Sequence, residues 1–87
     1  MRRNFTAAGE SLETLLADTE KQCNYFKPKV SSSKLEIAIL TPPTKSPLGA
    51  LEVAQVMEMV TKFFPEAEMD FEFADCQGMD YCVEVAW

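Results

Sequence analysis

Carboxylates are the residues of this sequence whose type and spacing could do chemistry. Asp70 and Glu72 alternate with apolar residues in one segment, and Glu84 does so in another. Two such carboxyls, for instance Asp70 and Glu84, would perform acid–base catalysis if one were buried and kept its proton. Both are expected on the wet face of a sheet, where neither is buried. A carboxylate enzyme is therefore the least favoured function, and we predict a non-enzymatic protein with no catalytic residues.

A divalent-cation site is the second chemistry that the carboxylates suggest. Asp75, Asp80 and Glu84 approach one another if residues 69–86 form a hairpin, but the DxDxDG pattern of a calcium loop is absent. Zinc is disfavoured because the chain contains no histidine and its cysteines form no CxxC pair. We predict no metal site and no bound cofactor.

The missing histidine and the cysteine count also narrow function and location. Without histidine there is no Ser-His or Cys-His nucleophilic dyad. An odd set of cysteines disfavours a secreted disulfide framework and favours two or three buried, inert thiols among Cys23, Cys76 and Cys82. No apolar run approaches the roughly 18 residues of a membrane span, and charged residues interrupt the segment that follows Arg2 and Arg3, where a signal peptide would be apolar. We expect a cytoplasmic protein that does not bind membranes.

Residues 6–26 are predicted to form the first helix. Apolar and small residues recur there at the spacing of one helical stripe: Phe5, Ala8, Leu12, Leu15, Leu16, Thr19, Cys23 and Phe26. Asn4 or Thr6 is the expected N-cap, although Gly9 indicates that the regular helix begins nearer Ser11. Pro28 ends the helix.

A strand and a second helix follow. Residues 34–40 alternate apolar with polar or small side chains, as a strand does, and a Pro-Pro pair then requires a loop. Ser46 is the expected N-cap of the second helix, with Pro47 at its first position. This helix runs to about Phe64 and is terminated by Pro65.

Residues 69–74 and 80–86 are predicted to pair as a β-hairpin. Both segments alternate, and the residues between them fit a three-residue loop with Gly78 in the left-handed conformation. This register places Asp70 opposite Glu84 and gathers the aromatic side chains on the other face.

These elements predict an α+β fold with the order α-β-α-β-β, in a single compact domain that spans residues 1–87. We expect a three-stranded, mainly antiparallel sheet in the order 1-3-2, with two helices packed on one face and the least charged strand, 80–86, in the middle. The order 1-2-3, with the first strand parallel to the second, is the alternative.

Negative charge is concentrated in the second half of the chain. Residues 1–45 contain seven Lys and Arg and five Asp and Glu, whereas residues 46–87 contain one lysine and nine acids, for a net charge of −6. Three interpretations compete: a solvated face that keeps the protein soluble, a surface that binds a basic protein, and the cation site considered above. The predicted partner-binding residues are Glu66, Glu68, Asp70, Glu72, Asp75 and Glu84.

In size and charge the chain resembles the small acidic single-domain proteins of phages and mobile elements that bind and block host enzymes. The resemblance implies an inhibitor of the anti-CRISPR or anti-restriction type, which mimics nucleic acid and blocks a basic nucleic-acid-binding surface of its target. Direct binding of nucleic acid is disfavoured because the only candidate basic patch, formed by Lys27, Lys29 and Lys34, lies in a flexible connection that is more typical of a solvated linker. The alternative function is an accessory subunit or homo-oligomerising domain, for example a homodimer, that associates through a sheet edge.

Overall fold

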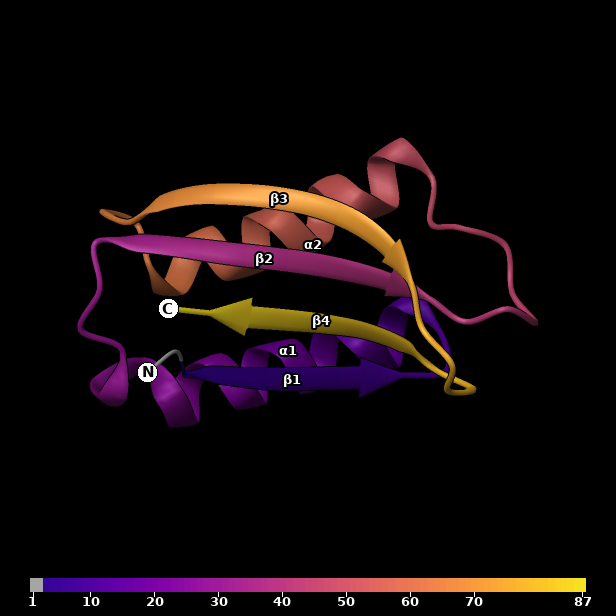
Figure 1. Ribbon diagram of the computed structural model, residues 1–87, viewed down its shortest axis with the longest axis horizontal. Helices are drawn as coiled ribbons and strands as arrows, with labels where there is room; N and C mark the ends of the chain where they lie inside the picture. The colour runs from indigo at the N-terminus through magenta and orange to yellow at the C-terminus, as the bar shows by residue number, and fades with distance from the viewer. Residues whose placement is uncertain (1–2) are drawn as a thin grey trace.

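The computed structural model describes residues 3–87 and confirms the α+β class with two helices on one face of a sheet (Figure 1). The elements are β1 (Asn4–Gly9), α1 (Leu12–Phe26), a short 3-10 helix η1 (Lys27–Lys29), β2 (Lys34–Thr41), α2 (Ala50–Phe63), β3 (Glu68–Asp75) and β4 (Tyr81–Ala86). Met1 and Arg2, which contribute to the charge count above, lie outside the described residues.

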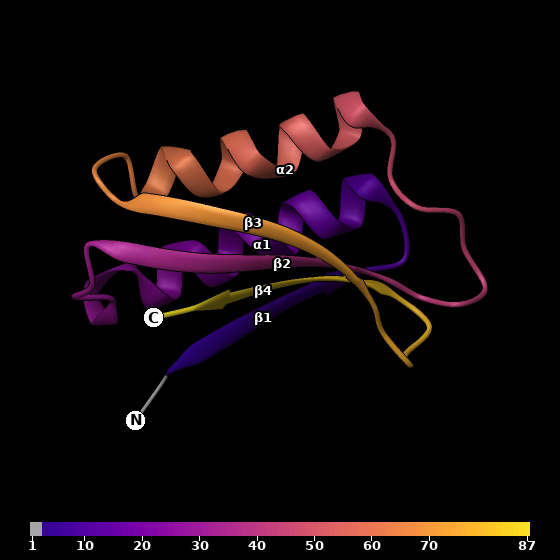
Figure 2. The same ribbon diagram turned by 45° about the horizontal axis from the view of Figure 1, so that its top comes forward.

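The four strands form one mixed sheet in the order β1-β4-β2-β3. β4 is antiparallel to both of its neighbours, whereas β2 and β3 are parallel. Figure 2 shows α1 and α2 side by side above the same face, so the opposite face of the sheet is left uncovered by helices. In the part of the chain that the structure describes, no helix is both long and apolar enough to span a bilayer.

Residues 4–9 form a strand, which corrects the prediction that they begin the first helix. Phe5, Ala7 and Gly9 alternate as buried residues and pair with Val85, Val83 and Tyr81 of β4. The helical spacing of Phe5 and Ala8 with later apolar residues is real, but pairing with β4 buries Phe5 and Ala7 almost completely. Tertiary pairing therefore overrides the local helical pattern.

α1 begins after Ser11, where glycine and serine change the direction of the chain. The Ser11 hydroxyl accepts a hydrogen bond from the Thr14 backbone N–H at 3.3 Å, and the Thr14 hydroxyl accepts one from the Ser11 backbone N–H at 3.0 Å. Gly9 packs directly on the first turn of the helix, where a Cβ atom would overlap the Leu15 backbone nitrogen and lie 2.6 Å from its Cα. The predicted stripe of the helix is confirmed by the buried side chains of Leu15, Thr19 and Cys23.

β3 and β4 do not form the predicted hairpin, because β2 lies between them. Both predicted strand orders are therefore wrong, although β4 is an interior strand, as its low charge favours. Gly78 has no positive φ and closes no tight turn. The residues between the two strands, 76–80, are enough to cross two strand spacings of about 4.8 Å each.

α2 begins at Ala50 rather than at Ser46. The Ser46 carbonyl accepts a hydrogen bond from the Tyr81 hydroxyl at 2.6 Å, so it is engaged with β4 instead of opening a helix. Gly49 is the N-cap, and its N–H donates to the Glu52 side chain at 2.8 Å. Pro65 follows the end of the helix, as predicted.

The core lies between the helices and one face of the sheet. Its buried side chains come from every strand except β3 and from both helices: Phe5, Ala7, Leu15, Cys23, Leu35, Ile37, Ile39, Val56, Val60, Val83 and Val85. β3 contributes only partly buried side chains. Phe73, which the alternation assigns to the core, is 65% exposed, because α2 starts late and leaves a cavity of about 380 Å³ beside it.

The close approach of Gly9 to α1 predicts a large difference between two glycine substitutions. Gly9→Ala forces the helix and β1 apart and should lower the free energy of unfolding by about 1–3 kcal/mol, the usual cost of overpacking. Gly78→Ala is the matched control, because nothing lies within 4 Å of its added Cβ. Urea denaturation curves of the two variants test this, and equal stabilities would contradict the packing of β1 on α1.

The burial of Cys23 predicts a selective thiol chemistry. Burial raises the pKa of the Cys23 thiol to about 11, so its thiolate is scarce near neutral pH in the folded protein. Iodoacetamide at mildly alkaline pH should therefore modify Cys76 and Cys82, which are half-buried, but spare Cys23 until urea is added. Mass spectrometry counts the adducts, and rapid triple modification of the native protein would show that α1 does not seal this position.

Candidate protein-binding face

The uncovered face of the sheet, called here the open face, gathers carboxylates from three strands. The alternation of each strand directs the apolar side chains to the helices and the polar ones away from them. The carboxylates of the open face are Glu36, Glu68, Asp70, Glu72 and Glu84. Lys34 is the one lysine or arginine in the four described strands.

Strand pairing brings four of these carboxylates into two rows across the sheet, and Glu68 pairs with Lys34 in a third. Ala38 on β2 pairs with Glu72 on one side and Glu84 on the other. Glu36 pairs with Asp70 and stands beside Ala86 in the next row. The predicted juxtaposition of Asp70 with Glu84 is therefore wrong, because β2 separates the two strands that were expected to form a hairpin.

Small side chains hollow the middle of the open face. A shallow cavity of about 160 Å³ is lined by Ala38 and Ala86 together with Asn4 and three glutamates, Glu36, Glu72 and Glu84. A second hollow of about 250 Å³ lies beside it and is bordered by Glu36, Asp70, Phe71 and Glu72. Alanines let the surrounding carboxylates form a concave, negatively charged surface.

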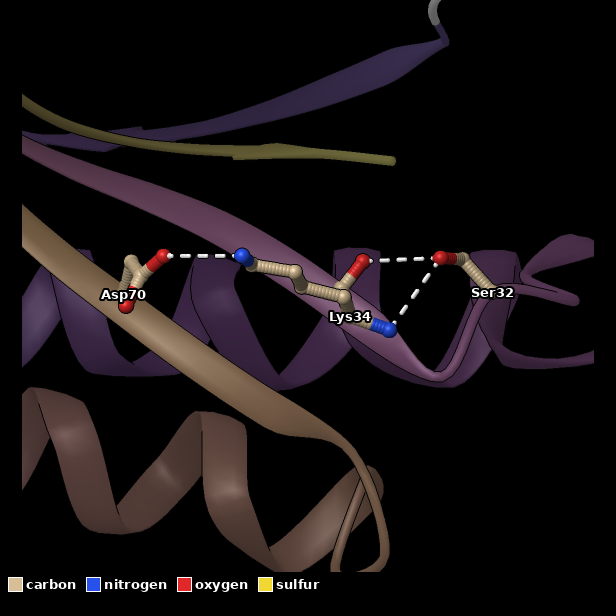
Figure 3. Close-up of polar contacts among 3 residues, drawn as sticks. All are labelled: Ser32, Lys34 and Asp70. Carbon is tan, nitrogen blue, oxygen red and sulfur yellow. Dashed lines mark hydrogen bonds and ion pairs between the residues drawn. The ribbon is translucent and has the colours of Figure 1, made fainter.

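The positive charge of Lys34 lies at one end of the open face. Figure 3 shows its ammonium group reaching from β2 to Asp70 on β3, with Nζ and Oδ2 3.7 Å apart. The Ser32 hydroxyl accepts from the Lys34 N–H at 3.1 Å and donates to the Lys34 carbonyl at 2.8 Å, which fixes the start of β2. Both charged side chains are more than half exposed, so the ion pair contributes little stability.

Two of the six predicted site residues lie away from the open face. Glu66 is in the turn between α2 and β3 and borders a cavity of about 460 Å³ that Lys27 also lines. Asp75 ends β3 on the helix side, where it lines the cavity beside Phe73. Within residues 3–87, no three His, Cys, Asp or Glu side chains are placed to ligate a common metal ion.

Glu36 is the one carboxylate of the open face that the sequence patterns do not predict as a site residue. Glu36 was placed correctly on the polar side of its strand, but that strand was expected at an edge, far from the acidic segment. In the structure β2 lies beside β3, and Glu36 reaches the centre of the carboxylate cluster. The alternation of Leu35, Glu36 and Ile37 predicts that Glu36 faces away from the core. The correct strand order was also needed to place it beside the acids of β3.

Cys76 and Cys82, which form no CxxC motif, lie close together at the connection between β3 and β4. Their thiols lie 3.5 and 3.7 Å from the same acceptor, the Asp80 carbonyl. Burial raises the pKa of Cys82, and the neighbouring Cys76 raises it further. Of the three thiols, only Cys23 is fully buried, so the prediction of two or three buried thiols is wrong.

The crowding of carboxylates predicts that neutralising them stabilises the fold. The double variant Glu72→Gln, Glu84→Gln keeps the side-chain shapes but removes like charges flanking Ala38, and should raise the free energy of unfolding by about 0.2–1 kcal/mol at low salt. The gain should shrink at high salt, where charges are screened. Glu66→Gln, off the open face, is the control and should change stability little. A loss of stability in the double variant, measured by urea denaturation, would contradict the inferred repulsion.

No protein-family model matches the chain, and no curated protein matches it in sequence. The case for a function therefore rests on the geometry and charge of the open face.

Proposed function

We propose that the open face binds a basic, nucleic-acid-binding surface of another protein and blocks it. The observation that carries the proposal is the gathering of five carboxylates from three strands on one face that no described helix covers. These charges repel one another, so the arrangement costs the folded state some stability. A surface selected for stability alone would intersperse opposite charges.

The regular spacing of the carboxylates suits a mimic of nucleic acid. Glu68, Asp70 and Glu72 recur at every second residue of β3, a repeat of about 6.6–6.8 Å along the strand. A nucleic-acid strand likewise carries one negative charge per nucleotide in a regular row. Lysines and arginines arranged to contact phosphates would meet carboxylates at a comparable repeat.

The summed field of the open face matters more than any single ion pair. An exposed pair contributes only about 0.2–1 kcal/mol, and salt screens it. Several charges of one sign on a concave surface focus the potential, steer association and orient docking. The net charge of −6 adds to this field at long range.

The sharpest form of the proposal is a cytoplasmic inhibitor of a host nuclease, of anti-CRISPR or anti-restriction type. The support for this form is the size and charge of the chain together with the concave acidic face. Association through the sheet edge at β3, as an accessory subunit would use it, is the second candidate, and the free edge of that strand favours it.

A charge-reversal experiment tests the leading proposal. The variant Glu68→Lys, Glu72→Lys, Glu84→Lys should capture fewer nucleic-acid-binding proteins from a heparin-enriched bacterial extract than the wild type does. The wild-type protein should displace a fluorescent DNA oligonucleotide from one of the captured proteins. The variant should require a concentration at least about tenfold higher for the same displacement. Fluorescence anisotropy at low and moderate salt measures the displacement, which should weaken steeply with salt.

The matched control reverses three acids outside the open face: Glu10→Lys, Glu13→Lys and Glu58→Lys. It changes the net charge equally, so it should displace DNA almost as well as wild type. The variant Glu68→Gln, Glu72→Gln, Glu84→Gln removes the same charges but keeps the side-chain shapes. It shows whether a loss of displacement comes from the charge change or from misfolding. If the control loses activity while the open-face variants keep it, the binding surface is on the helix side and the proposal is wrong.

A further inference from the structure

The outer edge of β3 is a free hydrogen-bonding edge of the sheet. β3 is the last strand in the order and pairs only with β2. The Glu68 N–H donates to the Ser33 carbonyl at 2.8 Å and the Cys76 N–H to the Thr41 carbonyl at 3.0 Å. Because bonding residues alternate along a parallel ladder, Met69, Phe71 and Phe73 direct their N–H and C=O groups to the free edge. Such a row of groups is a template for another strand.

β3 carries few of the features that protect an edge strand. It is eight residues long and contains no proline, glycine or lysine. β1, at the other edge, has six residues and ends at Gly9, which is packed against α1. Only the carboxylates of β3 discourage pairing, and they do so selectively, because they repel an acidic strand and attract a basic one.

The two faces of β3 specify different side chains in an added strand. On the open face, Glu68, Asp70 and Glu72 would contact basic residues. On the helix face, Met69, Phe71 and Phe73 would contact apolar ones, and Phe73 is 65% exposed. The cavity of about 380 Å³ between Phe73, Leu48 and Val53 has room for one apolar side chain.

A second copy of this chain fits the edge poorly. In an antiparallel pair of β3 strands, the carboxylates of Glu68, Asp70 and Glu72 share a face with the same carboxylates of the other copy. Like charges directly opposite each other destabilise a sheet. Charge complementarity therefore selects a basic segment of a different protein.

We propose that β3 binds an extended segment of a partner protein as a fifth strand of the sheet, and that this segment alternates lysine or arginine with apolar residues. The inference rests on the proposed function and specifies how the basic partner docks. Main-chain hydrogen bonds supply affinity, and the alternation supplies specificity.

A synthetic peptide that alternates lysine and valine, with blocked termini, is the probe. Titrated into the isotope-labelled protein, it should shift the amide resonances of Met69, Phe71 and Phe73 and slow their hydrogen exchange about tenfold or more. A peptide of the same composition, with all lysines followed by all valines, has the same charge and should bind about tenfold more weakly. Phe73→Lys should weaken binding of the alternating peptide similarly while leaving the fold intact, because Phe73 is exposed.

N-methylation of the peptide distinguishes strand addition from attraction between charges. In an antiparallel added strand, the residues that bond to Phe71 and Phe73 have side chains on the helix face, so they are the valines. In a parallel added strand, the bonding residues flank those positions and are the lysines. Methylating the backbone nitrogens of the residues that bond to β3, either all valines or all lysines, should abolish binding. Methylating the other residue type should leave the affinity within about twofold of that of the parent peptide.

The outcomes separate the two proposals. Loss of binding with one methylated peptide and not the other supports strand addition. If both methylated peptides bind as the parent does, if both weaken equally, or if the parent does not bind at all, strand addition at β3 is wrong. The proposed function is tested independently of strand addition, by the DNA-displacement experiment with the open-face variants.

Discussion

The backbone hydrogen bonds of β4 join two parts of the chain that otherwise share no sheet. On one side β4 pairs with β1, and on the other with β2. Val83 lies between Ala7 and Ile39, and Val85 lies between Phe5 and Ile37, so the same residues also fill the centre of the core. Without β4, β1 would lose its only strand partner, and the packing of α1 against α2 would be the main remaining link between the two parts.

The placement of charge follows from this constraint. Because the helices cover one face of the sheet, each strand must direct its polar positions to the other face. The order β1-β4-β2-β3 then sets Glu84, Glu36 and the acids of β3 on consecutive strands. The density of carboxylates is therefore a product of topology as much as of composition. Any function of the open face depends on the strand order that β4 establishes.

Local patterns were enough to predict most elements but not their arrangement. The stripe of α1, the extent of α2 after its first turn, and the strands at 34–40, 69–74 and 80–86 all agree with the structure. β1 was missed because Phe5, Thr6, Ala7 and Ala8 fit a helix as well as a strand, and their partner lies in β4 at the far end of the described chain. The hairpin was wrong because proximity in sequence favours pairing of β3 with β4, whereas β2 pairs with both. Alternation alone was enough to place Asp70, Glu72 and Glu84 on the open face, whereas Glu68 lay just before the predicted strand and Glu36 required the strand order.

The interior position of β4 has a consequence for synthesis on the ribosome. β1, α1, β2, α2 and β3 all emerge before β4, so the sheet cannot close while they are being made. During that time the gap between β1 and β2 exposes paired rows of apolar side chains and unbonded backbone groups. β2 and β3 are adjacent parallel strands that pair without β4, whereas β1 has no other strand to pair with. A chain in which β4 has not yet paired therefore exposes an aggregation-prone surface, and the pairing of β4 with β1 and β2 removes that surface.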